Sequence, residues 1–189
     1  MIQLFQTAKN LQEFCDSQGW ASCLIGGVAV QRWSEVRVTR DVDLSLLTGF
    51  GHEDPFLDAL VAAFPARIKD AKDFALRNRV LLLATPDGIG IDVSLAALPF
   101  EHDVIRRATV FNYGPGLDLR TCSAEDLMVM KLFASRPLDI RDAEGIAIRN
   151  REVLDWAYIE TQLAPLAEAK DAPEIMTLFD HIRAGKFST

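Results

Sequence analysis

Two aspartates on one predicted strand are the residues of this chain best suited to chemistry. Asp41 and Asp43 stand two positions apart in the string RDVDLSLL. Side chains two apart on a strand point to the same side, so both carboxylates share one face while Val42 and Leu44 point into a core. Two adjacent carboxylates repel each other unless a cation or a shared proton intervenes, and hard oxygen ligands suit Mg²⁺. The pair predicts a divalent-cation site; the alternative is two solvated residues at a sheet edge.

A glycine pair precedes these aspartates. Gly26 and Gly27 follow a short apolar run, residues 21–25, and lead into a short helical pattern at residues 28–33. Glycine allows a tight turn with positive φ and leaves the backbone bare, so the N–H groups here could approach a phosphate closely. A glycine pair alone is a weak signal and is more typical of a plain turn between a strand and a helix.

Four further ionisable positions stand in apolar or clustered surroundings. Asp92 lies in the middle of a predicted strand, where a carboxylate is costly unless it faces a cleft or a cation. Lys131 is the one cation in a nearly all-round apolar helix, and it needs a partner unless its ammonium group reaches out of the core. Asp139 and Asp142 are three positions apart and so share one helix face. The alternatives are an ordinary exposed strand residue for Asp92 and helix-start Asp–Arg pairs for the other two aspartates.

The elements that must position these residues form an α+β pattern, with strands mostly before residue 121 and helices after it. We expect a catalytic core at residues 1–121 and a helical C-terminal region at residues 122–189 packed on it. A capping box at Ser123 and Asp126 opens the lysine-bearing helix. The predicted strands cover 21–25, 41–47, 80–84, 89–95, 109–113 and 117–120, and the predicted helices cover 4–15, 28–33, 54–64, 100–108, 124–133, a stretch from 137, 156–169 with an interruption at Pro165, and 173–184.

Composition narrows the class of protein. The chain has 189 residues, of which 49% are hydrophobic and 25% charged, as expected for a globular protein with a sizeable core. A net charge of -7 argues against a protein that coats long nucleic acid. The three cysteines fit neither a disulfide framework nor a zinc site. The sequence has no signal-peptide pattern and no run long enough to span a bilayer, so we expect a cytoplasmic protein with no membrane partner.

Taken together, the glycine pair, the Asp41/Asp43 pair and the later Asp92 resemble the signature of the polymerase-β-like nucleotidyltransferase superfamily. The string GGVAVQRW…TRDVDLSLL, with Lys131 and the Asp139/Asp142 pair further on, looks like the AbiEii/AbiGii-type nucleotidyltransferases. These are toxins of abortive-infection and related toxin–antitoxin systems. Many superfamily members carry Gly-Ser in place of the Gly-Gly found here, and the Gly-Gly form occurs in the AbiEii-like branch.

The resemblance implies a polymerase-β-like mixed sheet flanked by helices and a transfer of NMP from an NTP to an acceptor hydroxyl. It implies two Mg²⁺ ions on Asp41, Asp43 and Asp92, with Asp92 also available as general base. By the same resemblance the residues that contact the nucleotide are Gly26, Gly27 and Lys131, while Asp139 and Asp142 orient Lys131 or bind ribose. The implied partners are NTP, a tRNA or other RNA end or a protein as acceptor, and a cognate antitoxin.

Two other functions remain open at this stage. One is nucleotidylation of an antibiotic or a small metabolite, and the other is a catalytically inert nucleotidyltransferase scaffold that serves as a binding module. Side-chain types do not define the NTP, the acceptor or the oligomeric state, because the shape of the pocket sets those properties.

Overall fold

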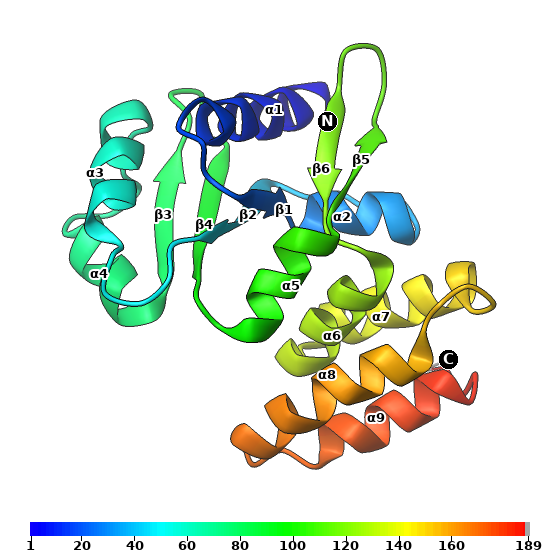
Figure 1. The fold of residues 1–189 in the computed structure, drawn as a ribbon. Helices are drawn as coiled ribbons and strands as arrows, with labels where there is room; N and C mark the ends of the chain where they lie inside the picture. Colours follow the sequence, from blue (N-terminus) through cyan, green and yellow to red (C-terminus); the bar gives the residue numbers. More distant parts are fainter. Residues whose placement is uncertain (188–189) are drawn as a thin grey trace. The chain divides into compact units, whose positions relative to one another are not determined.

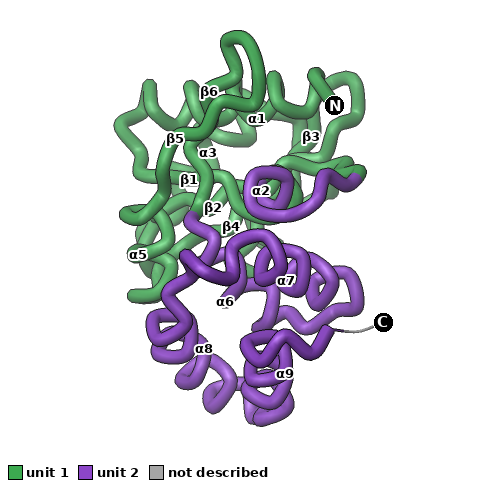
Figure 2. Tube along the Cα trace, turned by 90° about the vertical axis from the view of Figure 1, so that its right-hand side faces the viewer, with its two compact units in different colours: residues 1–28, 38–122 green, residues 29–37, 123–189 purple. Residues whose placement is uncertain are grey.

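The computed structural model describes residues 1–187, which form two compact units (Figure 2). Unit 1 consists of residues 1–28 and 38–122, and unit 2 consists of residues 29–37 together with the chain from 123 onward. Residues 29–37 thus belong to unit 2, whereas the sequence predicts them within the N-terminal core. They pack with the later helices through contacts such as Arg149 Nη1 with the carbonyl oxygen of Ser34, at 2.8 Å. Such long-range contacts leave no local sequence signal.

Unit 1 is built on a six-stranded mixed sheet with the strand order β3-β4-β2-β1-β6-β5 (Figure 1). The β2/β4 and β1/β6 pairs are parallel, and the other neighbouring pairs are antiparallel. This sheet confirms the α+β prediction. The strands are β1 (Ser22–Leu24), β2 (Asp41–Leu47), β3 (Val80–Ala84), β4 (Gly90–Ala96), β5 (Thr109–Asn112) and β6 (Asp118–Thr121).

One face of the sheet carries the hydrophobic core of unit 1. Alternate residues of β2, β3 and β4 are fully buried there, as the period of two requires. They pack against α1 (Ile2–Ser17), α3 (Asp54–Ala63) and α4 (Ala71–Asn78). The sheet residues of this cluster include Leu24, Val42, Leu44, Leu46, Leu81, Leu83, Ile91, Val93 and Leu95.

The opposite face is covered only in part within unit 1. There α5 (Pro99–Arg107) packs on β1 and β2, and Cys23 Sγ lies 4.0 Å from the carbonyl oxygen of Val104. Ser45 lies on the same side of β2 as the two aspartates, near the C-terminal end of the strand, and it is buried. The helix therefore covers the C-terminal part of β2 and leaves the aspartates at the start of the strand more exposed.

Unit 2 is helical. Its helix beginning at Ala124 has the predicted N-cap, because Ser123 Oγ accepts the backbone N–H of Asp126 at 3.1 Å. Apolar residues at helical spacing form its core, among them Leu127, Leu132, Ile146, Ile159, Leu163 and Phe179. Its helices are the last part of α2 (Gly26–Trp33), then α6 (Ala124–Ala134), α7 (Pro137–Asn150), α8 (Trp156–Ala169) and α9 (Glu174–Arg183).

The predicted break at Pro165 was wrong, because α8 continues through it. Proline removes one helical hydrogen bond, and Pro165 is exposed, so the carbonyl that loses its partner can be hydrated. Ile159, Leu163 and Ala167 are buried on both sides of the proline and hold the helix in place. Two other differences are that α2 begins at Gly26 instead of residue 28, and that α4 is a helix for which the sequence predicts no element.

No helix within residues 1–187 is long and apolar enough to cross a membrane. Cys15, Cys23 and Cys122 are free and buried, and all three belong to unit 1. Burial raises the pKa of the Cys15 thiol to about 11, so this thiol stays protonated at neutral pH.

Candidate functional site

The three aspartates singled out in unit 1 lie on one face of two adjacent parallel strands. In the β2/β4 register Asp43 stands opposite Asp92, and Asp41 stands opposite Gly90. Directly paired residues on neighbouring strands project to the same side, so Asp92 shares the face of Asp41 and Asp43. The side chains of Asp41 and Asp92 are 50% and 31% exposed, which leaves both accessible to a ligand.

The glycine pair lies against this acidic face. Gly26 has φ +55°, and a Cβ atom there would come within 2.1 Å of Asp43 Oδ2. A Cβ atom on Gly27 would come within 2.2 Å of Thr39 Oγ1, and the Gly27 N–H donates to Asp43 Oδ2 at 3.2 Å. The bare backbone thus lets α2 begin directly beside Asp43. The contact of these glycines with a phosphate stays a prediction.

Arg67 completes the acidic face, and sequence reasoning missed it. Its guanidinium donates through Nη2 to Asp92 Oδ1, and its Nη1 lies 3.9 Å from Asp41 Oδ1. The Arg67 backbone N–H bonds to the carbonyl oxygen of Leu82, the residue that pairs with Asp92 in the β3/β4 register. Arg67 lies in a connection between helices, where a single arginine carries no motif, so only the fold reveals its position.

Electrostatics couples these groups. Burial raises the pKa of the Asp92 carboxyl above its usual range, and the nearby charge of Asp41 acts in the same direction. The charge and hydrogen bond of Arg67 oppose that rise. Asp92 is therefore a stronger proton acceptor than an ordinary aspartate.

The donor set fits a magnesium site in its chemistry. Carboxylate oxygens are the ligands Mg²⁺ prefers, and three carboxylates share one face here. Gly90 presents bare backbone next to Asp41. A Cβ atom on Gly90 would lie only 2.1 Å from Asp41 Oδ1. Within residues 1–187, no group of three or more His, Cys, Asp and Glu side chains is arranged closely enough to hold a metal as it stands. Metal binding at this face would require the side chains to move.

The other predicted site residues meet inside unit 2. Lys131 Nζ lies 2.9 Å from Asp139 Oδ1 and 2.9 Å from Asp142 Oδ2, with only 9% of the lysine side chain exposed. Arg37 holds Asp142 through two bonds, from Nε to Oδ1 at 2.7 Å and from Nη2 to Oδ2 at 2.8 Å. Arg136 donates to both oxygens of Asp139. The buried ammonium is thus accounted for by two carboxylates, and its role toward a nucleotide stays a prediction.

This ion network predicts a pH dependence of stability. Burial alone would raise the pKa of Asp139, but the hydrogen bonds and charges of Arg136 and Lys131 prevail and hold it below the ordinary value. A carboxyl whose folded-state pKa is lowered stabilises the protein above its unfolded pKa, and that contribution is lost as pH falls through the folded pKa. We expect Asp139→Asn to lower the free energy of unfolding by about 2 kcal/mol at pH 7 and by much less at pH 3, measured by urea denaturation.

The matched control is Asp180→Asn, which removes the same charge from an exposed position on α9 of the same unit. It should leave stability within about 0.5 kcal/mol at both pH values. A loss for Asp139→Asn that is equal at pH 7 and pH 3 would contradict the lowered pKa.

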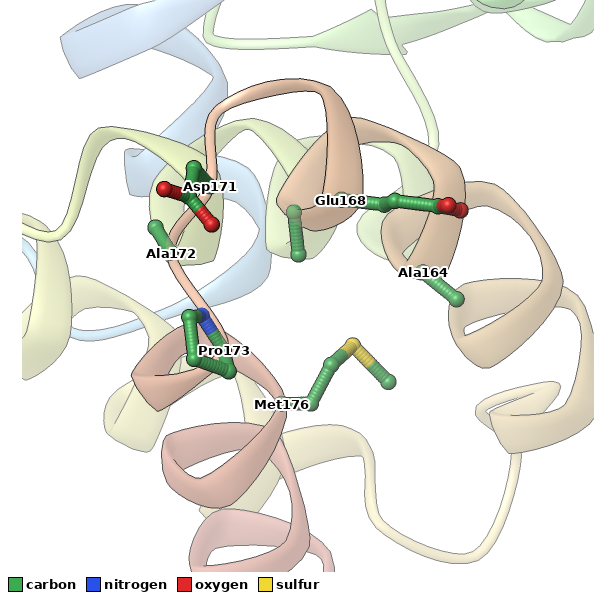
Figure 3. Close-up of a pocket in the computed structure, with 7 residues that line it drawn as sticks. Ala164, Glu168, Asp171, Ala172, Pro173 and Met176 are labelled. Carbon is green, nitrogen blue, oxygen red and sulfur yellow. The ribbon is translucent and has the colours of Figure 1, made fainter.

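Two surface hollows lie away from these residues. In unit 2 a hollow of about 320 Å³ at the α8/α9 junction is lined by small and apolar side chains with Glu168 and Asp171 at its rim (Figure 3). Unit 1 has one of about 380 Å³ beside Trp20, Arg106 and Arg120. Neither includes a predicted site residue. The candidate site is therefore described by the carboxylates on the sheet face of unit 1.

Comparison with known proteins identifies the family and the fold. The mixed α+β fold is that of nucleotidyltransferase-like proteins, and two solved structures with this fold match 98% and 92% of the chain. The chain belongs to the family described as "Nucleotidyltransferase of unknown function (DUF6036)", which matches residues 1–180. No curated protein matched the sequence.

Two solved structures illustrate the shared fold. An antigenic nucleotidyltransferase-like protein from Paracoccidioides brasiliensis is 18% identical with a TM-score of 0.51, over 98% of this chain and 94% of that one. The antibiotic-resistance factor ANT(2'')-Ia is 17% identical with a TM-score of 0.55, over 92% of each chain. At these identities the likeness establishes the fold.

Proposed function

We propose that this protein is a magnesium-dependent nucleotidyltransferase that moves an NMP unit from an NTP to an acceptor hydroxyl. The observation that carries the proposal is the register of β2 and β4, in which Asp43 stands opposite Asp92 with Asp41 on the same face and Gly26 alongside. Membership of a nucleotidyltransferase family supports it. An acidic face beside a bare glycine turn can bring metal-bound phosphates close to the backbone.

The roles follow from the positions of the side chains. Asp41, Asp43 and Asp92 would hold magnesium, which when bound neutralises the charge of the triphosphate and makes the acceptor hydroxyl more acidic. Asp92 would take the hydroxyl proton, because its carboxylate shares the face of Asp41 and Asp43, where the acceptor would bind. The acceptor oxygen forms a bond to the α-phosphorus of the NTP, and the bond to pyrophosphate breaks.

Lys131 would contact the triphosphate, as the resemblance to AbiEii-type enzymes implies. Its two carboxylate partners, Asp139 and Asp142, would then hold its ammonium group in a fixed orientation. Arg37 and Arg136 share the negative charge of these carboxylates. This sharing would leave part of the lysine charge available to a phosphate.

The proposed biological role is that of a toxin that nucleotidylates an RNA end or a protein side chain, restrained by a cognate antitoxin. The support is the string from Leu24 to Leu47, which resembles that branch of the superfamily. Transfer to a small molecule is the alternative, since one solved structure of the same fold is an antibiotic-resistance factor.

The test is a labelling experiment. The purified protein is incubated with Mg²⁺ and each of the four α-³²P-labelled NTPs, in separate reactions with bacterial total RNA, with a protein extract and with a panel of aminoglycosides. We expect one NTP to label RNA or protein, and growth to stop when the protein is expressed. EDTA should abolish the labelling.

The outcomes separate the alternatives. Label on an aminoglycoside, together with drug resistance of the host, would replace the toxin role by small-molecule transfer. Absence of label in every reaction, with no Mg²⁺-NTP binding by calorimetry, would overturn the enzymatic proposal and favour an inert binding module.

A further inference from the structure

We propose that Arg67 is a built-in counter-cation of the catalytic carboxylates, which competes with the divalent metal for Asp41 and Asp92 and so sets the metal affinity of the site. The inference rests on the proposed function, because it assumes that these carboxylates bind the metal. It assigns Arg67 as a positioning residue that acts through the two carboxylates.

The backbone around Arg67 holds it in this place. Residues 65–67 run along the outer edge of β3, where Ala66 forms a bridge with Leu83 and the Arg67 N–H bonds to the carbonyl oxygen of Leu82 at 3.0 Å. Because Leu82 pairs with Asp92, which in turn pairs with Asp43, this register directs the arginine across the strands toward the acidic face. An arginine on a free loop would have no such constraint.

Gly90 provides the space for this arrangement. It pairs with Asp41 in the sheet, and a Cβ atom there would come within 2.1 Å of Asp41 Oδ1 and 2.7 Å of Arg67 Nη1. Any side chain at position 90 would therefore displace both groups. The glycine allows guanidinium and carboxylate to meet over bare backbone.

The Arg67 guanidinium and a metal ion are both positively charged, so they compete for the same carboxylates. Without a divalent ion, Asp41 and Asp92 repel each other, and the guanidinium that contacts both relieves that repulsion. A metal ion that binds the same oxygens must displace the guanidinium or lie within a few ångströms of its positive charge. Displacement of the guanidinium and repulsion by its charge each raise the metal concentration that is needed to fill the site. The side chain of Arg67 is 35% exposed, so it can swing away when displaced.

The experiment measures metal binding without turnover. Mn²⁺ is titrated into metal-free wild-type protein, Arg67→Gln, Arg67→Lys and Arg40→Gln, and free Mn²⁺ is followed by electron paramagnetic resonance. Arg67→Lys keeps the positive charge, and Arg40→Gln removes one from an exposed neighbour of Asp41 in the sequence. Thermal unfolding in EDTA and in Mn²⁺ gives a second readout.

We expect Arg67→Gln to bind Mn²⁺ roughly tenfold more tightly than the wild type, with Arg67→Lys and Arg40→Gln within about twofold of it. Arg67→Gln should also unfold at a lower temperature than wild type in EDTA and gain more from Mn²⁺, because its carboxylates have lost their counter-ion. A merely structural arginine would lower the midpoint equally with and without Mn²⁺.

Unchanged or weaker Mn²⁺ binding by Arg67→Gln, with clear binding by wild type, would overturn the inference and leave the proposed function standing. Absence of Mn²⁺ binding in all four proteins would overturn both. If Arg67→Gln does not fold, Arg67→Lys decides: affinity within twofold of wild type supports a counter-charge, and a marked loss shows that the arginine is needed to build the site.

Discussion

Replacing Asp43 by asparagine is expected to lower nucleotide transfer by about 10³-fold, the effect of losing a few kcal/mol of stabilisation that only the reacting state receives. Asparagine keeps the shape of aspartate and can still accept the Gly27 N–H, which the carboxylate accepts at 3.2 Å. The fold should therefore survive while the charge that holds the metal is lost. Initial rates with saturating NTP, together with a circular dichroism melt, measure the two effects separately.

The matched control for this change is Asp87→Asn, in the exposed turn between β3 and β4 of the same unit. It removes the same charge and should leave transfer within about twofold of wild type. Equal loss of activity in the two variants would mean that the overall charge of the protein matters and the position of Asp43 does not.

The second large effect is expected from Gly26→Ala. The backbone at this position has φ +55°, which costs about 1 kcal/mol or more for a residue with a Cβ atom. That Cβ atom would also lie 2.1 Å from Asp43 Oδ2, so the carboxylate must move. We expect transfer to fall by about 10²-fold and the free energy of unfolding to fall by about 2 kcal/mol.

Gly116→Ala separates the two parts of this effect. Gly116 has φ +72°, but a Cβ atom there would meet nothing within 4 Å. This variant should lose only the backbone contribution, about 1 kcal/mol of stability, and keep full transfer activity. If Gly26→Ala behaved like Gly116→Ala in both assays, the close approach of Gly26 to Asp43 would contribute neither to transfer activity nor to stability.

Local periodicity explains which parts of the site the sequence could predict. The alternation in DVDLSLL is a property of one strand, so the shared face of Asp41 and Asp43 could be read directly. The N-cap at Ser123 and the boundaries of most helices could be predicted because they too depend on neighbouring residues. The pairing of Asp43 with Asp92 joins strands about fifty residues apart, and only the sheet establishes it.

The arginines show where local reasoning ends. Arg67 and Arg37 both lie outside regular helices and strands, and each reaches carboxylates far away in the chain. Nothing in their immediate neighbours distinguishes them from the other basic residues. The three-residue spacing of Asp139 and Asp142 placed them on one helix face, but that spacing could not indicate that Lys131 and Arg37 would meet them there. Partners of buried charges are chosen by tertiary packing.

The cysteines offer a natural reporter of core opening. Cys15, Cys23 and Cys122 have no solvent exposure and all belong to unit 1, and unit 2 has none. A thiol-reactive dye can therefore modify the native chain only during excursions that open the sheet and its covering helices. The rate of alkylation would therefore measure the opening of unit 1, which carries the three aspartates, without an engineered label. It would not respond to motions confined to unit 2.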